Sequence, residues 1–501
     1  MALHATLLTT TAVGVSTLFF YIGACIIYNL FFHPLRHYPG PLLMRATRWG
    51  YCYKLISGTL PFDLLELHKK YGDVVRVAPD ELAFWNARAW KEVMGHRTQG
   101  APEFRKFAQF YRPVPGQATN IINSEGSEHS RLRRQMAHGF SDRGLREQQP
   151  LIMKYVDLFI QRLHENSTKT DPIDIMAWYN FTTFDIIGDL AFGEPFGCLE
   201  NSEYHPWVKN IFESARLGSI LQTANHFQPL RKLITKVLAT KSLQEAREKN
   251  MGNARDKLQR RMDVGKDGGG RPDLIEGLLK KKEELGLSFD ELASNSNILI
   301  IAGSETTATL LTGLTYHLLC NPQCLVKLTN EVRSSFQKEE DIDMLSVGRL
   351  TYMLACIEEA LRVYPPVPLG LPRVAPPGGA TVSGRFVPEN TIVAIHQWSV
   401  NHNEQNFKRP FEFHPERFLG DEEFSTDNKE ALQPFHVGPR NCLGRNLSYS
   451  EMKLILARLI WNFDMELAAE SRNWAEKQKI FILWDKGPLR VRLTPVIRTT
   501  S

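Results

Sequence analysis

The stretch FHVGPRNCLG (Phe435–Gly444) constrains this chain more than any other part of its sequence. It sets one cysteine into a turn that contains glycine and proline, and it leads directly into an apolar segment with helical periodicity. A thiolate is a strong, soft metal ligand, and the aligned amides at a helix N-terminus stabilise it. Gly438 can take a left-handed turn, Gly444 lets a flat ligand lie close to the backbone, and Arg440 supplies a cation suited to a carboxylate. We therefore expect Cys442 to hold the metal of a flat, carboxylate-bearing group.

A flat group that carries carboxylates and accepts a thiolate ligand is haem. The signature Phe-x-x-Gly-x-Arg-x-Cys-x-Gly is matched at Phe435, Gly438, Arg440, Cys442 and Gly444. The chain thus resembles the cytochrome P450 (haem-thiolate) superfamily. The resemblance implies that Cys442 is the axial ligand of the haem iron and that the other four residues help to bind the haem. The alternative is a buried cysteine in a tight turn, but five fixed positions rarely arise together by chance.

A second motif lies in the segment Asn297–Leu319, which is apolar on nearly all sides and is therefore predicted to be a buried helix. Its only carboxylate is Glu305, which is followed by Thr306. The threonines could simply bond back to carbonyls one turn earlier, or the acid and the alcohol could deliver protons to a molecule held against the helix. The segment is similar to the family motif Ala/Gly-Gly-x-Asp/Glu-Thr-Thr/Ser at Ala302, Gly303, Glu305, Thr306 and Thr307. This similarity implies that Glu305 and Thr306 are catalytic.

A third motif is the pair Glu359 and Arg362 in EEALRVYPP. Residues three apart share one face of a helix and can form an ion pair, although a solvated surface pair is the default reading of this spacing. Downstream, FHPERFL places Arg417 where the family has the arginine that completes a Glu–Arg–Arg network. By resemblance, the three residues lock the core behind the haem, which is a structural role.

Two further segments resemble the family's haem-propionate contacts. In EHSRLRRQM, His129 and Arg133 stand where many members have Trp-x-x-x-Arg. The resemblance implies that Arg133 pairs with a propionate and that His129 offers an N–H as tryptophan does, with its charge state open. A solvated basic helix face is the alternative. Arg373, in GLPRVAP, falls where the family often has another propionate partner.

The N-terminal run from Ala5 to Phe32 contains no Lys, Arg, His, Asp or Glu. It is longer than the roughly 20 residues that cross a bilayer, and it lacks the basic first region of a cleaved signal peptide. The first arginine is Arg36, so the positive side is C-terminal and the main domain is expected in the cytosol. We expect a single-pass anchor at residues 5–32 and a proline-rich hinge at residues 33–45, since proline cannot continue the helix.

The remaining residues, 46–501, are expected to be mainly α-helical with a small β portion. Strand pairs are predicted at Asp73–Trp85, at Ala380–His396 and between the tail segments KIFILW and LRVRLTP. Length alone suggests about three domains, but no linker supports a division. The resemblance implies instead the family's single triangular helical domain. The seven cysteines are scattered, which argues against a disulfide framework or a zinc site. A net charge of +5 without a basic run argues against nucleic-acid binding.

The resemblance covers essentially the whole chain and is greatest for fungal microsomal members that act in secondary metabolism. It implies a monooxygenase in the endoplasmic reticulum membrane that inserts one oxygen atom of O2 into a lipophilic small molecule. The chain has no dinucleotide fingerprint, so the electrons would come from a separate NADPH-cytochrome reductase. Its acidic docking face would meet Arg131, Arg134 and Arg445. Pocket walls are expected at Gly100–Ile122, Asn210–Val237, the start of the Asn297–Leu319 segment, Val367–Leu371 and Ile480–Leu483.

Three other functions fit parts of this pattern. A haem-thiolate isomerase or dehydratase would need no O2, but such relatives often lack the acid–alcohol pair. A non-catalytic haem binder, such as a gas sensor, would not need that pair either. A hydrolase with Cys442 as nucleophile would need a histidine base, and His436 is within reach in the sequence.

Overall fold

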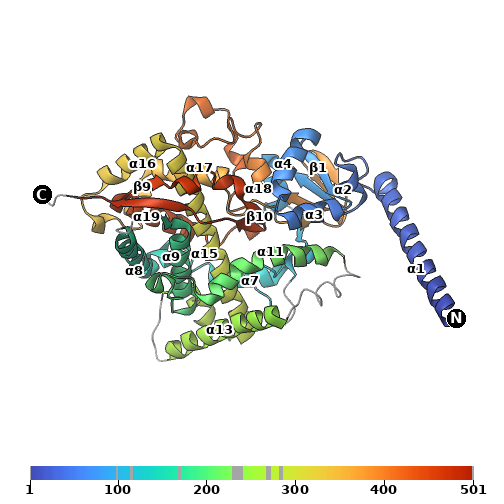
Figure 1. Ribbon diagram of the computed structural model, residues 1–501, viewed down its shortest axis with the longest axis horizontal. Helices are drawn as coiled ribbons and strands as arrows, with labels where there is room; N and C mark the ends of the chain where they lie inside the picture. Colours follow the sequence, from blue (N-terminus) through green and yellow to red (C-terminus); the bar gives the residue numbers. More distant parts are fainter. Residues whose placement is uncertain are drawn as a thin grey trace.

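The long helix α15 (Phe289–Cys320) runs through the middle of the molecule in a computed structural model that describes residues 2–97, 100–112, 117–167, 171–227, 241–266, 272–280, 282 and 286–498 (Figure 1). The helix begins at a capping box, in which the Ser288 hydroxyl accepts from the Glu291 amide and the Glu291 carboxylate accepts from the Ser288 amide. It is buried over most of its length, as its uniformly apolar sequence predicts.

Helices pack around α15 on several sides. Its largest contact is with α9 (Ile175–Phe192), which is itself buried on nearly every side. The helices α13 (Lys241–Lys266), α16 (Pro322–Ser335), α17 (Thr351–Val363) and α19 (Arg445–Asn462) also contact it. The other described helices are α1 (Ala2–Ile27), α2 (Leu42–Ala46), α3 (Trp49–Ser57), α4 (Leu60–Tyr71), α5 (Ala87–Ala89), α6 (Ala108–Tyr111), α7 (Gly126–Met136), α8 (Asp142–Ser167), α10 (Cys198–Asn201), α11 (Pro206–His226), α14 (Glu276–Lys280) and α18 (Gln397–Asn401).

The strands are few and short, so the expected mainly helical fold with a small β portion is confirmed. The described strands are β1 (Val74–Ala78), β2 (Glu81–Phe84), β3 (Arg105–Lys106), β4 (Ile173–Asp174), β5 (Arg373–Val374), β6 (Ala380–Val382), β7 (Arg385–Val387), β8 (Ile392–Ile395), β9 (Phe463–Leu467), β10 (Lys479–Phe481), β11 (Leu483–Asp485) and β12 (Arg490–Pro495). The largest sheet has the order β1-β2-β8-β5-β3, and β4-β12-β9 form a second. The pairs β6-β7 and β10-β11 stand as separate hairpins.

Two of the three strand predictions are confirmed and one is wrong. β1 and β2 pair antiparallel around the Pro79–Asp80 turn, and β6 pairs with β7 while β8 continues into the larger sheet. The tail segments KIFILW and LRVRLTP do not pair with each other. KIFILW folds back on itself at Ile482, whose φ of +88° reverses the chain between β10 and β11. LRVRLTP forms β12, which pairs with β9 directly after α19.

The helix α19 follows the cysteine turn as predicted, but its burial is wider than one face. Residues 454–462 are all buried, including the polar Arg458 and Asn462. Phe463, the residue after the helix, is also buried and begins β9. An amphipathic pattern therefore underestimates how deeply this helix lies in the molecule.

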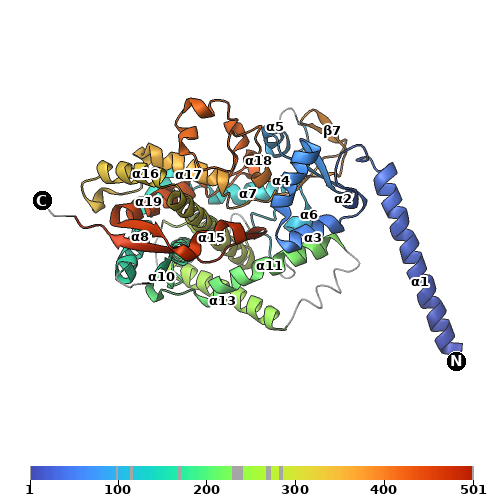
Figure 2. The same ribbon diagram turned by 45° about the horizontal axis from the view of Figure 1, so that its top comes forward.

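The N-terminal helix α1 projects away from the rest of the molecule in both views (Figures 1 and 2). Residues Leu8–Phe32 are long and apolar enough to cross a membrane and are not buried, whereas α15 passes the same test as a mostly buried core helix. The proline-rich segment after α1 is fixed to the body. Leu35 is fully buried, the Tyr38 hydroxyl donates to the Phe386 carbonyl at 2.8 Å, and the Pro39 carbonyl accepts from the Arg76 amide at 2.7 Å.

Candidate active site

A cavity of about 310 Å³ lies between α15, α7 and the turn that precedes α19. Segments far apart in the sequence meet at this cavity, and most of the predicted site residues line it. Those that line the cavity are Phe435, Arg440, Cys442, Gly444, His129, Arg133, Arg373 and Thr306. Gly438 and Glu305 are not in its lining.

The cysteine turn is closed by a backbone hydrogen bond from the Cys442 amide to the Phe435 carbonyl, 2.8 Å long. Gly438 has φ +78°, and a Cβ atom there would lie 2.0 Å from the Met94 carbonyl oxygen, so only glycine fits. A Cβ atom on Gly444 would meet nothing closer than the Phe140 ring at 3.8 Å, on the cavity side of the turn. The turn therefore presents the sulfur beside a space that it leaves open for a ligand.

The Cys442 side chain is exposed to this cavity, while the protein packs densely around it. Burial raises the pKa of the Cys442 thiol, and the Gly444 amide together with the guanidinium groups of Arg133 and Arg445 acts in the opposite direction. A bound metal cation would remove the thiol proton outright. The sulfur thus lies where a metal would convert it to a thiolate and where a nearby amide and cations would stabilise that charge.

One wall of the cavity carries a concentration of positive charge. The lining contains the cations Lys106, Arg133, Arg373 and Arg440, and among the residues that the structure describes it has one acid, Glu451. Arg373 Nη1 and Arg440 Nε are buried and have no hydrogen-bond partner in the described part of the chain. Arg440 Nη1 donates to the Glu103 carboxylate at 2.6 Å, and the two unpaired N–H groups beside it favour a further acceptor, for which an anion is well suited. A ligand with carboxylates at one edge, such as haem, fits this wall.

Lys106, on β3, is a member of this wall that the sequence did not reveal. Its Nζ donates to the carbonyls of Ile122 at 2.7 Å and Ser124 at 2.8 Å. Burial and the neighbouring Arg373 and Arg440 lower the pKa of Lys106 to about 7. An anion placed in the cavity would restore its positive charge. In the sequence Lys106 is one lysine in a polar stretch, and only the pairing of β3 with β5 brings it to Arg373.

His129 and Arg133, on α7, differ in what they contact. Burial, followed by the nearby Lys106 and arginines, lowers the pKa of His129 to about 4, so its imidazole is neutral at physiological pH and can donate one N–H. Arg133 Nη1 donates to the Asn441 carbonyl at 2.7 Å, and Nη2 donates to the Asn441 side-chain oxygen. Arg133, which was predicted to pair with a propionate, thus binds Asn441, the residue before Cys442.

The opposite wall is the groove of α15 at Ala302, Gly303 and Thr306. The Thr306 hydroxyl donates to the Ala302 carbonyl at 2.7 Å. Thr306 therefore bonds back to its own helix and also lines the cavity, so both alternatives from the sequence hold. Gly303 also has a packing role, because a Cβ atom there would lie 2.8 Å from the Ile187 side chain of α9.

Glu305 faces away from the cavity and is 1% exposed. Its Oε1 accepts from Lys486 Nζ and, at 3.1 Å, from the Thr309 hydroxyl. Its Oε2 has no partner among the described residues. The two predicted catalytic residues are neighbours in the sequence, but only Thr306 touches the cavity.

Glu451, on α19, is a second acid that the sequence analysis missed. It lines the cavity, is 2% exposed, and has an Oε2 atom without a partner in the described chain. Burial raises the pKa of Glu451 to about 8, while a hydrogen bond with Thr307 opposes that shift. The side chain therefore carries a proton at neutral pH. Glu451 is the single carboxylate of α19, and that was the signal that could have identified it.

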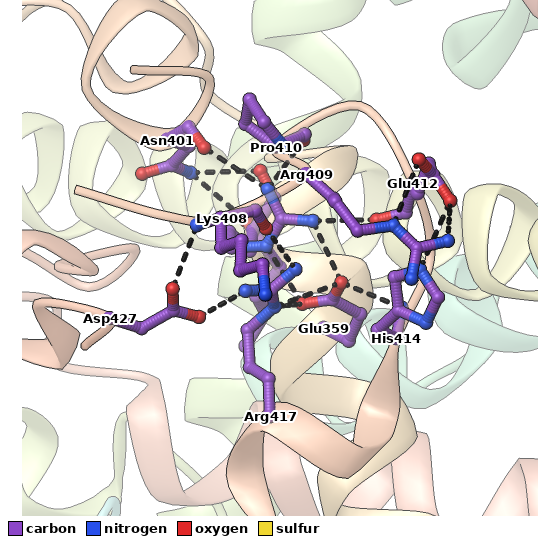
Figure 3. Close-up of polar contacts among 11 residues, drawn as sticks. Glu359, Asn401, Lys408, Arg409, Pro410, Glu412, His414, Arg417 and Asp427 are labelled. Carbon is purple, nitrogen blue, oxygen red and sulfur yellow. Dashed lines mark hydrogen bonds and ion pairs between the residues drawn. The ribbon is translucent and has the colours of Figure 1, made fainter. Parts of the chain in front are cut away.

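The predicted Glu–Arg–Arg network forms at the C-terminal part of α17 (Figure 3). Arg362 binds Glu359 through two hydrogen bonds of 2.7 and 2.8 Å, and Arg417 Nε binds the same carboxylate at 3.1 Å. All three side chains are fully buried. Arg417 also pairs with Asp427, which the sequence analysis missed and which balances the second arginine. Backbone carbonyls at Asn401, Pro410 and Glu412 accept the remaining Arg362 hydrogen bonds.

The apolar lining agrees in part with the predicted pocket walls. Within the predicted ranges, the cavity is lined by Tyr111, Ile121, Ile122, Ile298, Leu299, Ala302, Val367 and Leu371. The predicted wall at Ile480–Leu483 does not reach the cavity, and neither do residues 216–227, the part of the predicted wall Asn210–Val237 whose side chains are described. Residues 113–116 and 228–237, and the side chains of residues 210–215, lie outside the described part of the chain.

His436 does not form the dyad that a cysteine hydrolase would need. Its ring packs edge-on against Trp90 with centroids 5.0 Å apart, and its Nε2 has no hydrogen-bond partner among the described residues. Burial lowers the pKa of His436 to about 3, so it is a poor base at neutral pH.

Comparison with known proteins identifies the chain's relatives. The family model of cytochrome P450 matches residues 39–492. The cytochrome P450 monooxygenase prhB of Penicillium brasilianum is 45% identical over 481 residues, which cover 96% of this chain and 97% of that protein. Averantin hydroxylase of Dothistroma septosporum is 44% identical over 97% of this chain and 92% of its own length. Trichothecene C-15 hydroxylase of Fusarium sporotrichioides is 44% identical over 95% of this chain and 96% of its own length.

Proposed function

This chain belongs to the cytochrome P450 family, and we propose that it inserts one oxygen atom of O2 into a lipophilic small molecule held beside Cys442. One observation carries the proposal: a single cavity joins an open cysteine sulfur, a wall of cations with unpaired N–H groups, and the α15 groove with its Thr306 hydroxyl. The relatives named as hydroxylases of averantin and of a trichothecene support a fungal secondary-metabolite intermediate as the substrate.

The residues present fit haem, which belongs to this family. The sulfur of Cys442 would hold the iron, and Arg373, Arg440, Lys106 and His129 would hold the carboxylates. Phe435, Gly438 and Gly444 shape the turn around the sulfur, and Arg133 holds that turn through Asn441. When bound, haem supplies the activation of O2 and the one-electron chemistry that amino-acid side chains lack.

The chain's own residues would orient the substrate, exclude water from the cavity and supply protons. The apolar lining from Ile121, Ile298 and Val367 would orient a lipophilic substrate and exclude bulk water. Thr306 presents a hydroxyl to the cavity, and Glu451 carries a proton behind it next to Thr307. Glu305 is a second acid on the far side of the same helix turn. Acids and alcohols arranged in this way can hold and pass protons into a dry site.

Electrons would come from a membrane-bound NADPH-cytochrome reductase. The predicted docking residues Arg134 and Arg445 are exposed, while Arg131 is partly buried and lies 3.9 Å from Glu291. Exposed cations around the cysteine turn could attract an acidic partner and bring it near the metal side of the site.

The N-terminal segments support a membrane-bound arrangement. We assign residues 5–32 as a single-pass anchor, residues 33–45 as a hinge, and residues 46–501 as the haem-thiolate monooxygenase domain. The exposed apolar helix and the arginines that follow it favour an enzyme whose catalytic domain lies on the cytosolic face of the endoplasmic reticulum membrane. Because the hinge is bonded to β1 and to the β6-β7 hairpin, it would hold the domain close to the bilayer.

The decisive experiment supplies the haem-loaded protein with a fungal NADPH-cytochrome reductase, NADPH and 18O2. Substrates are first chosen from a metabolite library by their effect on the haem absorbance. We expect product that carries one labelled oxygen and forms only when NADPH is present. Conversion without NADPH and O2 would indicate an isomerase or dehydratase. Ligand binding without substrate-dependent NADPH consumption would indicate a non-catalytic haem binder.

A further inference from the structure

The loop of residues 118–124 forms part of the cavity lining, although no helix or strand sets its shape. Its residues Ile121 and Ile122 belong to the apolar lining. The backbone of the loop supplies one turn, in which the amides of Asn123 and Ser124 both donate to the Asn120 carbonyl, at 3.2 and 2.9 Å. Loops with few internal hydrogen bonds are mobile unless other segments bind them. The position of Ile121 therefore depends on side chains outside the loop.

The first turns of α15 hold the loop from one side. Asn295 Oδ1 accepts from the Ile121 amide at 3.0 Å, and the Ser294 hydroxyl donates to the Ala118 carbonyl at 2.9 Å. Asn120 Nδ2 donates to the same hydroxyl at 3.1 Å. Ser294 and Asn295 are 3% and 1% exposed, so these hydrogen bonds form away from water, where breaking them is costly.

Lys106 holds the same loop through a different set of contacts. Its Nζ atom donates to the carbonyls of Ile121 at 3.3 Å, Ile122 at 2.7 Å and Ser124 at 2.8 Å. An ammonium group has three donors, so one turn of the loop can accept all of them. The Lys106 amide also donates to the Glu125 carboxylate at 2.7 Å, directly before α7 begins. Lys106 thus binds the loop at its centre and at its end.

A lysine in this place is costly for the fold. Lys106 is 7% exposed, and Arg373 and Arg440 on the same wall repel its charge. A buried cation is stabilised by the bonds that its charged group makes. In the described part of the chain, the hydrogen bonds of this ammonium go to the loop, and the Tyr111 ring lies 5.4 Å from it. Holding the loop is therefore the reason that the contacts give for a lysine here.

We propose that Lys106 is a positioning residue for substrate selection: it acts through the 118–124 loop to fix Ile121 against the cavity, and so limits the shape of the lipophilic molecule that fits beside Cys442. This role rests on the proposed function and adds to it the residue that shapes the pocket. A loop fixed before the substrate binds costs no ordering at that moment, so a molecule that matches the lining of Ile121 binds more tightly than one that does not.

Amide hydrogen exchange across residues 118–124 of the haem-loaded protein gives the first test. Lys106→Met keeps the length of the side chain and removes its three donors. Arg105→Met is the matched control, because Arg105 is the exposed neighbour of Lys106 on β3. We expect exchange of the Ile121 amide to be about tenfold faster or more in Lys106→Met, since buried carbonyls that lose their donor make the closed loop less stable. Arg105→Met should exchange like the wild type.

Ligand selection gives the second test and needs no knowledge of the natural substrate. Imidazole and 4-phenylimidazole both bind haem iron through a ring nitrogen, and the phenyl group adds an apolar surface that the lining can contact. Spectral titration of the haem-loaded protein measures both dissociation constants. We expect Lys106→Met to lower the preference for 4-phenylimidazole over imidazole several-fold. Asn295→Ala should lower the same preference, because it releases the Ile121 amide from α15 and leaves the cationic wall intact.

Unchanged loop exchange or an unchanged ligand preference in Lys106→Met would overturn the inference. If Lys106 served only to hold a haem carboxylate, the variant would release haem faster to an acceptor haem protein while loop exchange and preference stayed at wild-type values. Should Lys106→Met fail to load haem, Lys106→Gln is measured by the same criteria, since its amide has no charge and one donor fewer. None of these results would touch the proposed function, which the wild-type haem spectrum and labelled product test separately.

Discussion

Arg133 donates a hydrogen bond of 2.7 Å to the carbonyl oxygen of Asn441, the residue that precedes Cys442. A second nitrogen of the same guanidinium reaches the Asn441 side-chain oxygen. A planar fork bound to two acceptors on one residue fixes that residue's orientation as well as its position. Helix α7 therefore holds the turn that carries Cys442 in place, and both Arg133 and Asn441 line the cavity.

Arg133→Lys should weaken retention of haem, because an ammonium group cannot make both contacts in the same plane. We expect the rate of haem transfer to an excess of an acceptor haem protein to rise several-fold. Arg134→Lys is the matched control, since Arg134 is exposed on the same helix. Equal transfer rates for the two variants would show that the Arg133–Asn441 contact does not hold the turn.

Glu359→Gln should destabilise the folded protein strongly, because it leaves Arg362 and Arg417 buried without their shared carboxylate. Breaking a buried ion pair in this way costs about 3–5 kcal/mol. The free energy of unfolding in guanidinium chloride measures the loss. Glu404→Gln, at an exposed glutamate, should change it little. A variant of Glu359 as stable as that control would contradict the structural role of the network.

The site residues that could be predicted from the sequence are those that lie a few positions apart in a recognisable motif. Glu359 and Arg362 are one helix turn apart, and Cys442 lies two residues before the Gly444 N-cap of α19, so local geometry brings them together. Asp427 and Lys106 were missed because nothing near them in the sequence distinguishes them. Their roles depend on contacts that only the folded chain creates.

Glu305 illustrates the same limit within a single motif. The sequence places it beside Thr306, but adjacent residues point about 100° apart around a helix, so neighbours in one motif need not face the same cavity. Thr306 and Thr307 line the cavity, whereas Glu305 does not. The orientation was settled by Lys486, which lies 181 positions away in the sequence. The tail strands were mispaired for a similar reason, since Ile482 adopts a positive φ that its β-branched side chain disfavours.

Gly438→Ala should prevent assembly of the cysteine turn. The added Cβ would lie 2.0 Å from the Met94 carbonyl, which belongs to backbone that cannot move aside easily, and the φ of +78° would be strained. We expect a large drop in the ratio of haem to purified protein. Gly348→Ala, where nothing lies within 4 Å of the added atom, is the control. A normal haem content in Gly438→Ala would show that the turn tolerates a side chain.

Glu451→Gln should change how stability depends on pH. The pKa of Glu451 is raised to about 8 by burial, compared with about 4.3 in an unfolded chain. Between these values the folded protein binds one more proton than the unfolded chain, so the stability of the wild type falls as the pH rises toward about 8. Glutamine does not titrate and avoids this loss.

The free energy of urea unfolding, measured on the haem-loaded protein from about pH 5 to about pH 8, checks this prediction. The difference between Glu451→Gln and wild type should shift in favour of the variant as the pH increases. Glu470→Gln, at an exposed glutamate, should run parallel to the wild type. Parallel curves for Glu451→Gln would mean that Glu451 is ionised in the folded protein.

The bond between Cys442 and the haem iron is the claim on which the proposed function depends, and carbon monoxide tests it most directly. The reduced protein is exposed to the gas and its absorbance is compared with that of Cys442→Ser and Cys320→Ser, the latter changing an exposed cysteine elsewhere. We predict the red-shifted band of a thiolate-ligated haem in the wild type and in Cys320→Ser, and its loss in Cys442→Ser. A wild-type protein without that band, or a Cys442→Ser protein that keeps it, would contradict the account.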